Sequence, residues 1–453
     1  MRGRGPDEPL RAISHFCPMA MSSQRSVDLE GDVEAAIDPR VRPLSISATL
    51  AARAQADALA SEGRTIYRLG LGQSPFPVPG PLVEALRRNA HQRDYLPVRG
   101  LPSLRAAVTD YHARRFGFTR STEDVVVGPG SKELMFLLQL CYAGEIVVST
   151  PAWVSYAPQA RLAGRVVRFV PSSEADDHLP SPLVLDELWA RDGARPRILV
   201  LNYPSNPTGT TCSSDRLGEL AAVCRRHRVI VMSDEIYGEL QFDGGHRSIA
   251  ALYEEGTIVS TGLSKWCGAG GWRLGVLSFP PRLRRLNETL VAAASETYST
   301  TSAPIQHAAV EAFAGSAELD AYLSDVRRVL GLLMPWCAAQ LRWAGLRVAE
   351  PRGAFYLFPS FEPLRGELTR NGLRTDRELA ARLLKDAGIS CLPGVEFGVS
   401  PDSLFVRLAL VDFDGAVALS AVGRDQLDEA FLHERLGPVS RAIGALCAWC
   451  RAL

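Results

Sequence analysis

Short runs of β-branched and aliphatic residues alternate with amphipathic helical patterns between residue 124 and about residue 315. Seven such runs follow one another along the chain: 124–127, 145–148, 165–169, 198–201, 229–232, 257–259 and 274–277. Successive positions in these runs are apolar, so each strand is expected to be buried on both faces. Apolar strands separated by helices predict an α/β fold, with a mostly parallel central sheet and helices on both of its faces. Ligands of such sheets bind at the carboxyl ends of the strands.

The pattern changes after about residue 315, where longer helical segments enclose two short strands at 353–358 and 404–410. This change predicts a second, smaller α+β domain. The expected division gives residues 74–315 to a large ligand-binding domain, and residues 41–73 with 316–453 to the small domain. Residues 1–40 mix charges and contain no apolar segment of the length that a secretory signal needs, so we expect a poorly ordered extension.

Charge and cysteine content restrict the class of protein. Fifty basic residues balance fifty acidic ones, which argues against nucleic acid or an anionic membrane as the main partner. No apolar run approaches the ~20 residues of a membrane-spanning helix. The nine cysteines are scattered, and several lie inside apolar patterns, as reduced thiols of a cytoplasmic protein would. No metal site is expected, because Cys447 and Cys450 lack a second pair or a histidine partner.

Two strand ends carry residues suited to an anionic ligand. Gly130, Ser131 and Lys132 lie between the strand at 124–127 and an apolar helix, where free backbone N–H groups and the helix dipole favour a phosphate. Any capped helix start can look the same. Lys265 and Arg273 follow the strand at 257–259 in a glycine-rich loop. A partly desolvated lysine is a nucleophile toward carbonyl groups, and the arginine fork suits a phosphate, although a solvated surface lysine is the alternative.

Three further strand ends carry an aromatic ring, an amide and an acid. Trp153 follows the strand at 145–148, where core packing is the alternative role. Asn206 belongs to a stiff loop rich in Asn and Pro that can fix an amide against a ligand oxygen. Asp234, with Tyr237 beyond it, ends an apolar strand. A carboxylate there is costly unless it is paired with a cation, and a pyridinium nitrogen is such a cation.

Taken in chain order, these residues form a ligand set for pyridoxal 5'-phosphate. The span from Arg42 to about Asp412 resembles the class I aminotransferases of the type I pyridoxal-phosphate fold. The resemblance is carried by three motifs: Asn206-Pro-Thr-Gly, Asp234-Glu-Ile-Tyr237 and Ser264-Lys265-x₇-Arg273-x-Gly275. It implies transfer of an amino group between an L-amino acid and a 2-oxo acid, with aspartate or glutamate and 2-oxoglutarate as one expected pair.

Other functions on this fold stay open at this point. A β- or γ-lyase, an aminocyclopropane-type synthase or an amino-acid oxidase would use the same lysine, aspartate and arginine, because the cofactor supplies the difficult chemistry. A non-catalytic regulatory domain would need an attached DNA-binding helix-turn-helix module, and residues 1–40 are too short to hold one with its linker.

The resemblance also implies roles for the cofactor-site residues. Lys265 holds the cofactor and moves the proton of the substrate's α-carbon, and Asp234 keeps the ring nitrogen protonated. In the family pattern, Asn206 and Tyr237 bond the phenolic oxygen of the cofactor, and Trp153 packs on the face of its ring. The residues implied at the phosphate are Gly130, Ser131, Lys132, Ser264 and Arg273. Tyr95 matches a tyrosine that bonds the phosphate of the neighbouring subunit, so a homodimer with shared sites is expected.

The implied substrate contacts come from both ends of the chain. Arg407 matches the arginine that binds the α-carboxylate of the substrate, with further contacts from Asn206 and from the backbone of Gly72. Thr49, Lys132 and Ser299 resemble the positions with which bacterial subgroup Ib aspartate aminotransferases hold the side-chain carboxylate, Ser299 coming from the neighbouring subunit.

This sequence departs from the family pattern at three places. Gly262 stands where many relatives have a phosphate-binding serine, and Trp266 is unusually bulky directly after the lysine. Residues 414–437 are longer than the usual connection to the final helix, and would cover either the site or another surface.

Overall fold

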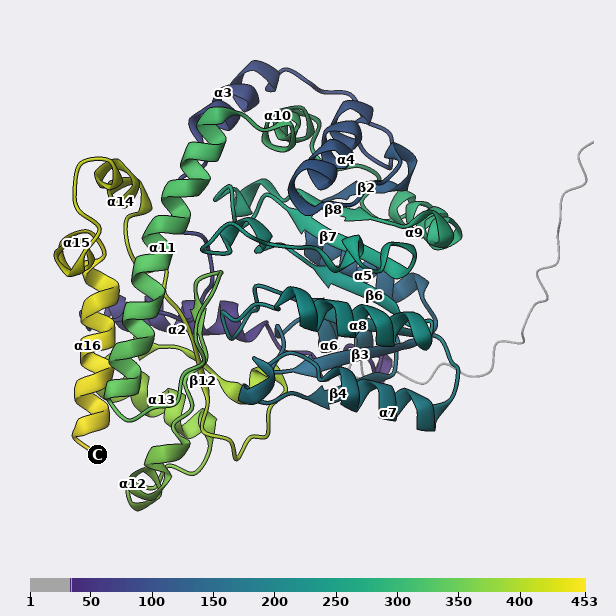
Figure 1. Cartoon of the computed structure of the whole chain (residues 1–453). Helices are drawn as coiled ribbons and strands as arrows, with labels where there is room; N and C mark the ends of the chain where they lie inside the picture. The colour runs from purple at the N-terminus through teal and green to yellow at the C-terminus, as the bar shows by residue number, and fades with distance from the viewer. Residues whose placement is uncertain (1–32, 34) are drawn as a thin grey trace, which may run out of the picture. The chain divides into compact units, whose positions relative to one another are not determined.

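The computed structural model describes residue 33 and residues 35–453. It contains two compact units, residues 1–43 and 44–453. The predicted disorder of residues 1–40 falls largely on residues outside the described ones. In the described part of the first unit, Arg40 forms an exposed ion pair with Asp38 at 2.7 Å. The second unit contains all the elements discussed below (Figure 1).

Seven strands form the central sheet in the order β2–β8–β7–β6–β5–β3–β4. Their bounds are β2 (Val125–Gly128), β3 (Glu145–Thr150), β4 (Val167–Pro171), β5 (Arg197–Asn202), β6 (Ile230–Asp234), β7 (Thr257–Gly262) and β8 (Gly275–Ser278). All pairings are parallel except the two made by β8. The predicted mostly parallel sheet is therefore confirmed, with one antiparallel strand between β2 and β7.

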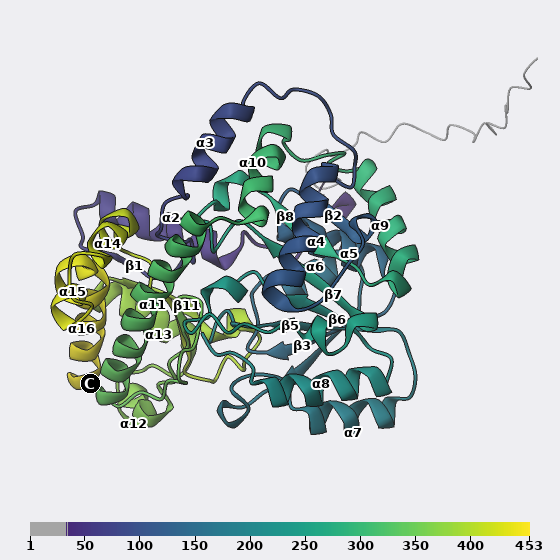
Figure 2. The same cartoon turned by 45° about the horizontal axis from the view of Figure 1, so that its top comes forward.

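Helices cover both faces of this sheet because its strands are apolar on both sides. On one face, Val126, Val148 and Ile198 pack against α5, α6 and α9, whereas on the other Val147 and Leu199 pack against α7 and α8. The helices of this part of the chain, which Figure 2 shows around the sheet, are α3 (Gly80–Asn89), α4 (Pro102–Phe116), α5 (Ser131–Cys141), α6 (Tyr156–Leu162), α7 (Pro182–Asp192), α8 (Ser214–Arg226), α9 (Arg284–Ser295) and α10 (Ala303–Ala314).

Two small sheets join segments from opposite ends of the chain. One pairs β1 with β10 in parallel, and the other has the antiparallel order β11–β12–β9. Their bounds are β1 (Tyr67–Arg68), β9 (Tyr356–Leu357), β10 (Ile389–Ser390), β11 (Leu392–Pro393) and β12 (Val406–Ala409). The amide of Ala409 donates to the carbonyl of Leu69 at 2.9 Å. The segment that leads to Gly72 is thereby held beside β12.

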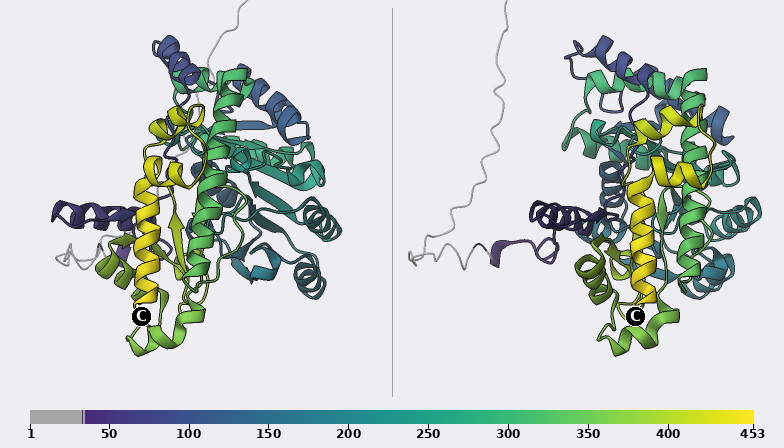
Figure 3. Two further views of the ribbon diagram at one scale, coloured as in Figure 1. Left: turned by 60° about the vertical axis from the view of Figure 1, so that its left-hand side comes forward. Right: turned by 90° about the vertical axis from the view of Figure 1, so that its left-hand side faces the viewer.

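The remaining helices accompany these small sheets. They are α2 (Ala48–Ser61), α11 (Ala317–Trp343), α12 (Arg365–Arg370), α13 (Asp376–Ala387), α14 (Gly415–Val422), α15 (Glu429–Arg435) and α16 (Gly437–Arg451). Helix α16 lies alongside α11 in both views of Figure 3. A capping box formed by Thr375 and Glu378 starts α13. Together with the small sheets, these elements agree with the α+β character predicted after residue 315, while the boundaries of the small domain stay a prediction.

The long connection at residues 414–437 forms α14, α15 and the turns around them. Val422, Phe431 and Leu432 are buried in the same apolar cluster as Leu330 of α11. None of residues 414–437 lines the candidate site, so this stretch covers helix α11 instead. Within residue 33 and residues 35–453, no helix is long and apolar enough to cross a membrane.

Candidate functional site

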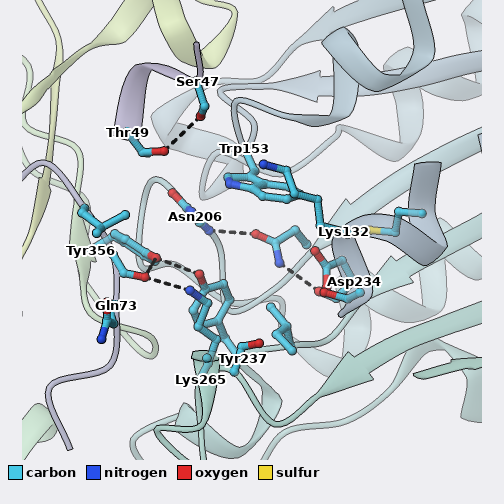
Figure 4. A pocket seen from close by; sticks show the side chains of 18 of the residues that line it. Ser47, Thr49, Gln73, Lys132, Trp153, Asn206, Asp234, Tyr237, Lys265 and Tyr356 are labelled. Carbon is cyan, nitrogen blue, oxygen red and sulfur yellow. Dashed lines mark hydrogen bonds between the residues drawn. The ribbon is translucent and has the colours of Figure 1, made fainter. Parts of the chain in front are cut away.

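A pocket of about 440 Å³ lies at the carboxyl ends of β5, β6 and β7. Twelve of the predicted site residues line it: Thr49, Gly72, Ser131, Lys132, Trp153, Asn206, Asp234, Tyr237, Ser264, Lys265, Arg273 and Arg407. They come from the strand ends of the central sheet, from the starts of α2 and α5, from the segment after β1 and from β12. Figure 4 shows several of these side chains turned toward one another. The structure thus gathers in one place residues that span most of the chain.

Sheet register aligns the polar ends of the neighbouring strands. Asn202 of β5 lies opposite Asp234 of β6, and Asp234 lies opposite Ser260 of β7. The Asn202 amide donates to the Asp234 backbone carbonyl at 2.9 Å and accepts from the backbone N–H of Asn206 at 2.8 Å. Asn202 therefore fixes the loop that carries Asn206, a role the sequence analysis did not assign.

Asp234 is buried and only half satisfied. Its Oδ2 accepts a hydrogen bond from the Tyr156 hydroxyl at 2.6 Å, whereas its Oδ1 has no partner among the described residues. Burial raises the pKa of Asp234 to about 6, against the opposing effects of the Tyr156 hydrogen bond, the Ile236 backbone N–H and the Lys265 charge. Its Oδ1 is thus a buried acceptor that a ligand's donor or cation could fill.

Lys265 projects into the pocket just beyond β7. Its Nζ donates to the carbonyl oxygen of Gly72 at 2.7 Å. Burial, followed by repulsion from Arg407, lowers the pKa of Lys265 to about 8, although the Asp234 charge works in the opposite direction. A lysine with a pKa near neutrality exists partly as the free amine, the form that attacks carbonyl carbon and accepts protons.

The start of helix α5 and the Arg273 loop form an anion-binding end. Gly130 has a φ of 96°, and a Cβ there would overlap the guanidinium of Arg273. Arg273 itself is left-handed, with a φ of 53°, and its Nη1 donates to the Gly270 carbonyl at 2.9 Å. Free N–H groups at the helix start and a fixed guanidinium suit a phosphate.

At Gly262, a Cβ would lie 2.6 Å from the Leu274 carbonyl oxygen, so close approach of the backbones excludes the serine of the family pattern.

These features fit pyridoxal phosphate. A protonated ring nitrogen would satisfy the unpartnered Asp234 oxygen, the amine of Lys265 suits the aldehyde, and the α5 end suits the phosphate. Among the described residues, no group of three or more His, Cys, Asp or Glu side chains could hold a metal ion.

Arg407 lies buried at the other end of the pocket. It donates to the Gly70 carbonyl through Nη2 and to the Asn206 Oδ1 through Nη1, the latter at 3.4 Å. Its Nε has no partner among the described residues. The guanidinium carbon lies 5.0 Å from the centre of the Tyr356 ring. A buried guanidinium with unused donor capacity is suited to bind a carboxylate.

Tyr356 connects this arginine to the cofactor end. Its hydroxyl lies 2.7 Å from that of Tyr237 and donates to the Gly72 carbonyl at 3.5 Å (Figure 4). A Cβ at position 72 would overlap the Tyr356 ring, so the ring packs directly against the glycine backbone.

Lys132 and Thr49 approach the pocket from α5 and α2. The Lys132 ammonium lies 5.4 Å from the centre of the Trp153 ring. Burial, and then repulsion from Arg273, lowers the pKa of Lys132. The Thr49 hydroxyl shares a hydrogen bond of 3.0 Å with Ser47 (Figure 4).

Three predicted residues do not line the pocket within this chain. Gly130 lies directly behind Ser131, as described above. Tyr95 is 91% exposed, and Ser299 has a φ of 58° with its hydroxyl donating to the Ser295 carbonyl at 3.4 Å. The roles of Tyr95 and Ser299 at a neighbouring subunit stay predictions.

Trp266 is buried outside the pocket lining. It is 2% exposed, and its ring stacks on Tyr111 with centroids 6.1 Å apart. Its bulk therefore belongs to the core behind Lys265.

Sequence reasoning missed Tyr156, Asn202 and Tyr356 as site residues. Tyr156 follows Trp153 by three positions, and Asn202 directly follows the strand predicted at 198–201. Tyr356 lies in the short strand predicted at 353–358. Each lies beside a recognised motif, which was the available signal, but Asp234, Tyr237 and the other distant partners lie 32 or more residues away in the sequence.

Comparison with known proteins places these features in a family context. The family model for class I and II aminotransferases matches residues 64–414. An asparagine–oxo-acid transaminase of Streptococcus mutans is 30% identical over 381 residues, which cover 82% of this chain and 93% of that protein. An aspartate aminotransferase of Geobacillus stearothermophilus is 32% identical over 380 residues, with the same coverage. The structure of Thermus thermophilus aspartate aminotransferase with maleate aligns with a TM-score of 0.78 and 26% identity, covering 92% of this chain and 99% of that one.

Proposed function

Since the chain belongs to the family of class I and II aminotransferases, we propose that aspartate or glutamate is the amino donor in one of its substrate pairs. The protein is a pyridoxal-phosphate-dependent aminotransferase, which transfers an amino group between an amino acid and a 2-oxo acid. The fold and activity expected from the sequence are thereby confirmed. The identity of the donor is the part that we propose.

The distribution of positive charge in the pocket carries the proposal. The chain has three lysines, Lys132, Lys265 and Lys385, and the first two line the same pocket. Among the described lining residues, two more cations are present, Arg273 and Arg407. With Lys265 at the cofactor, Arg273 at its phosphate and Arg407 at the α-carboxylate, Lys132 is left for a second carboxylate. Relatives named as aspartate aminotransferases support the same choice.

Different residues of the pocket have different roles in the reaction. The cofactor, when bound, supplies an electron sink for the negative charge that develops at the α-carbon. In our proposal Asp234 keeps its ring nitrogen protonated, Trp153 packs on the ring, and Tyr237 with Asn206 bonds the phenolic oxygen. Lys265, with its pKa lowered to about 8, accepts the α-proton and returns it at the neighbouring carbon.

In our proposal, residues at the two ends of the pocket orient the substrate. Arg407 takes the α-carboxylate with help from the Gly72 backbone, and Ser131 and Ser264 contribute to the phosphate site. Lys132 and Thr49 hold the far carboxylate, with Ser299 of a second subunit. Holding the substrate at both ends presents its α-hydrogen to Lys265.

Replacing Lys132 tests the substrate assignment. A charge-assisted hydrogen bond is worth about 1.5–3 kcal/mol, so Lys132→Ala should lower kcat/KM for aspartate and glutamate on the order of 10- to 100-fold. The value for alanine as donor should fall much less. Lys385→Ala, which removes the exposed lysine of α13, is the matched control. An equal loss for acidic and neutral donors would place Lys132 on the phosphate and contradict the proposal.

We also propose a cytoplasmic homodimer with shared sites. The eight cysteines of the described residues are free, as in a reducing compartment. The exposed ring of Tyr95 suits a contact with a second copy of the chain.

Mixing subunits bearing Tyr95→Ala with subunits bearing Lys265→Ala should restore one native site per heterodimer. Mixing Lys265→Ala with Arg273→Ala should restore none, because both residues line the same chain's pocket. Equal recovery in the two mixtures would contradict the shared site.

A further inference from the structure

The hydroxyls of Tyr237 and Tyr356 form a buried pair that no predicted role explains. Their oxygens lie 2.7 Å apart, and the residues are 3% and 1% exposed. Each hydroxyl has one proton to donate. The direction of this hydrogen bond therefore decides where the Tyr237 proton points.

Either hydroxyl of the pair could be the donor, but among the described residues the Tyr356 hydroxyl has a second acceptor, the Gly72 carbonyl at 3.5 Å, and the Tyr237 hydroxyl has none. When the Tyr356 proton is directed at that carbonyl, Tyr237 is the hydroxyl left to donate within the pair. Burial raises the pKa of both phenols, so each keeps its proton. With this direction, the Tyr237 proton is directed away from any other acceptor.

A cofactor oxygen that carries negative charge is a stronger acceptor than a neutral phenol. If Tyr237 donates to that oxygen, its own oxygen becomes free to accept, and the Tyr356 proton is the one placed to fill it. We propose that Tyr356 is a positioning residue whose hydroxyl donates to Tyr237 and thereby keeps the Tyr237 O–H directed at the cofactor. This inference rests on the proposed contact between Tyr237 and the phenolic oxygen.

The surroundings of Tyr356 hold its hydroxyl in place for this task. Strand β9 pairs with β12 through Tyr356 and Ala409, and the ring lies under Arg407 and against Gly72. The hydroxyl has the Gly72 carbonyl as a second acceptor at 3.5 Å. Tyr356→Phe would keep the ring in these contacts and remove only the hydroxyl, with its bonds to Tyr237 and to the Gly72 carbonyl, and the double variant with Tyr237→Phe separates these two bonds.

The test is a pH titration of the visible absorbance of the bound cofactor, which requires no substrate. A donated hydrogen bond stabilises negative charge on the phenolic oxygen and so lowers the pKa of the proton shared with the lysine-linked nitrogen. Tyr237→Phe should raise that pKa by about 1 to 2 pH units. Tyr356→Phe should raise it by about 0.2 to 0.7 pH units, because a chain of hydrogen bonds strengthens each member. In a Tyr237→Phe background, Tyr356→Phe should have no effect.

Tyr253→Phe is a closely matched control. Tyr253 is also buried, has Arg225 5.1 Å above its ring and donates to the Val229 carbonyl at 3.0 Å, but it does not line the pocket. It should leave the titration unchanged. KM for the amino acid should also stay near wild type in Tyr356→Phe, since the ring under Arg407 remains, while kcat falls.

Two outcomes would overturn the inference. One is an unchanged titration in Tyr356→Phe, and the other is an equal change with and without Tyr237, which would mean that Tyr356 acts independently of it. Neither outcome would bear on the preference for acidic donors, which is measured with Lys132→Ala. A wild-type protein without a visible cofactor band would instead contradict the assignment of Lys265.

Discussion

Two buried carboxylates at the end of β6 occupy opposite kinds of surroundings. Asp234 faces the pocket with one oxygen bonded by Tyr156 and the other unpartnered among the described residues. Glu235, the next residue, faces a closed polar cluster. Its Oε1 accepts from the hydroxyls of Ser233 and Ser248, each at 2.7 Å, and its Oε2 accepts from His246 Nε2 at 3.0 Å.

The difference separates a carboxylate kept for a ligand from one used by the fold. A buried acid with all its acceptors filled stabilises the turn that it joins, and adding a ligand would gain nothing there. A buried acid with an unfilled acceptor is unstable alone and becomes satisfied when a cation binds. Adjacent residues of similar chemistry can thus be assigned opposite roles from their hydrogen-bond partners.

The largest expected effect is on turnover in Asp234→Asn. The amide can still accept from Tyr156 but cannot hold the cofactor's ring nitrogen protonated. Turnover should fall on the order of 10³-fold or more, since each tenfold loss corresponds to about 1.4 kcal/mol of barrier. Steady-state kinetics on protein with a full complement of cofactor provides the measurement. Near-normal turnover would remove the distinction between the two acids.

Glu235→Gln should act mainly on stability. The variant replaces a charged acceptor of several donors in a buried cluster, so the free energy of unfolding should fall by about 2–4 kcal/mol. Urea unfolding measures the loss. Turnover per folded, cofactor-loaded site should fall by less than about tenfold. A loss of turnover as large as that of Asp234→Asn would show that both acids serve the reaction.

The smallest expected effect is on the stability of the apoenzyme, where Asp234 has no cofactor to pair with. The pKa of Asp234 in the folded apoenzyme is raised to about 6 from its ordinary value of 3.8. The group's contribution to stability is thus full below pH 4 and is lost as the pH rises through 6, because only the unfolded chain ionises easily. At pH 8 the loss is about 2–3 kcal/mol.

An asparagine in place of the acid cannot ionise, so apoenzyme carrying Asp234→Asn should be more stable than wild type at pH 8 and nearly equal to it at pH 4. Urea midpoints at the two pH values give the comparison. Added pyridoxal phosphate should remove the advantage at pH 8. A constant difference between the variants at both pH values would contradict the raised pKa.

The central sheet could be predicted from the sequence because its strands are buried on both faces. All seven expected runs became strands, with small changes of boundary such as the start of β4 at Val167 rather than at residue 165. The two small-domain strands were predicted too long. The expected strand at 353–358 is reduced to Tyr356–Leu357, because ladder pairing with β12 extends over only two residues.

The site was predictable where one motif carries several of its residues, as Asp234 and Tyr237 do. It was not predictable where a contact joins separate motifs. Tyr156 meets Asp234 across 78 residues of sequence, and Tyr356 meets Tyr237 across 119. Nothing in the local pattern of either tyrosine indicates which distant hydroxyl or carboxylate it will reach, since sheet order and the path of the chain decide that.

Because the Tyr356 ring packs against Gly72, residues 72 and 356 are expected to change together in evolution. Residue 72 cannot gain a side chain while a large ring occupies residue 356, so substitutions at the two positions should become acceptable only together. A mutagenesis library that varies residue 72 alone would yield mostly inactive clones. Libraries that vary both positions at once would instead explore new shapes for the wall between the Arg407 and Lys265 ends of the pocket.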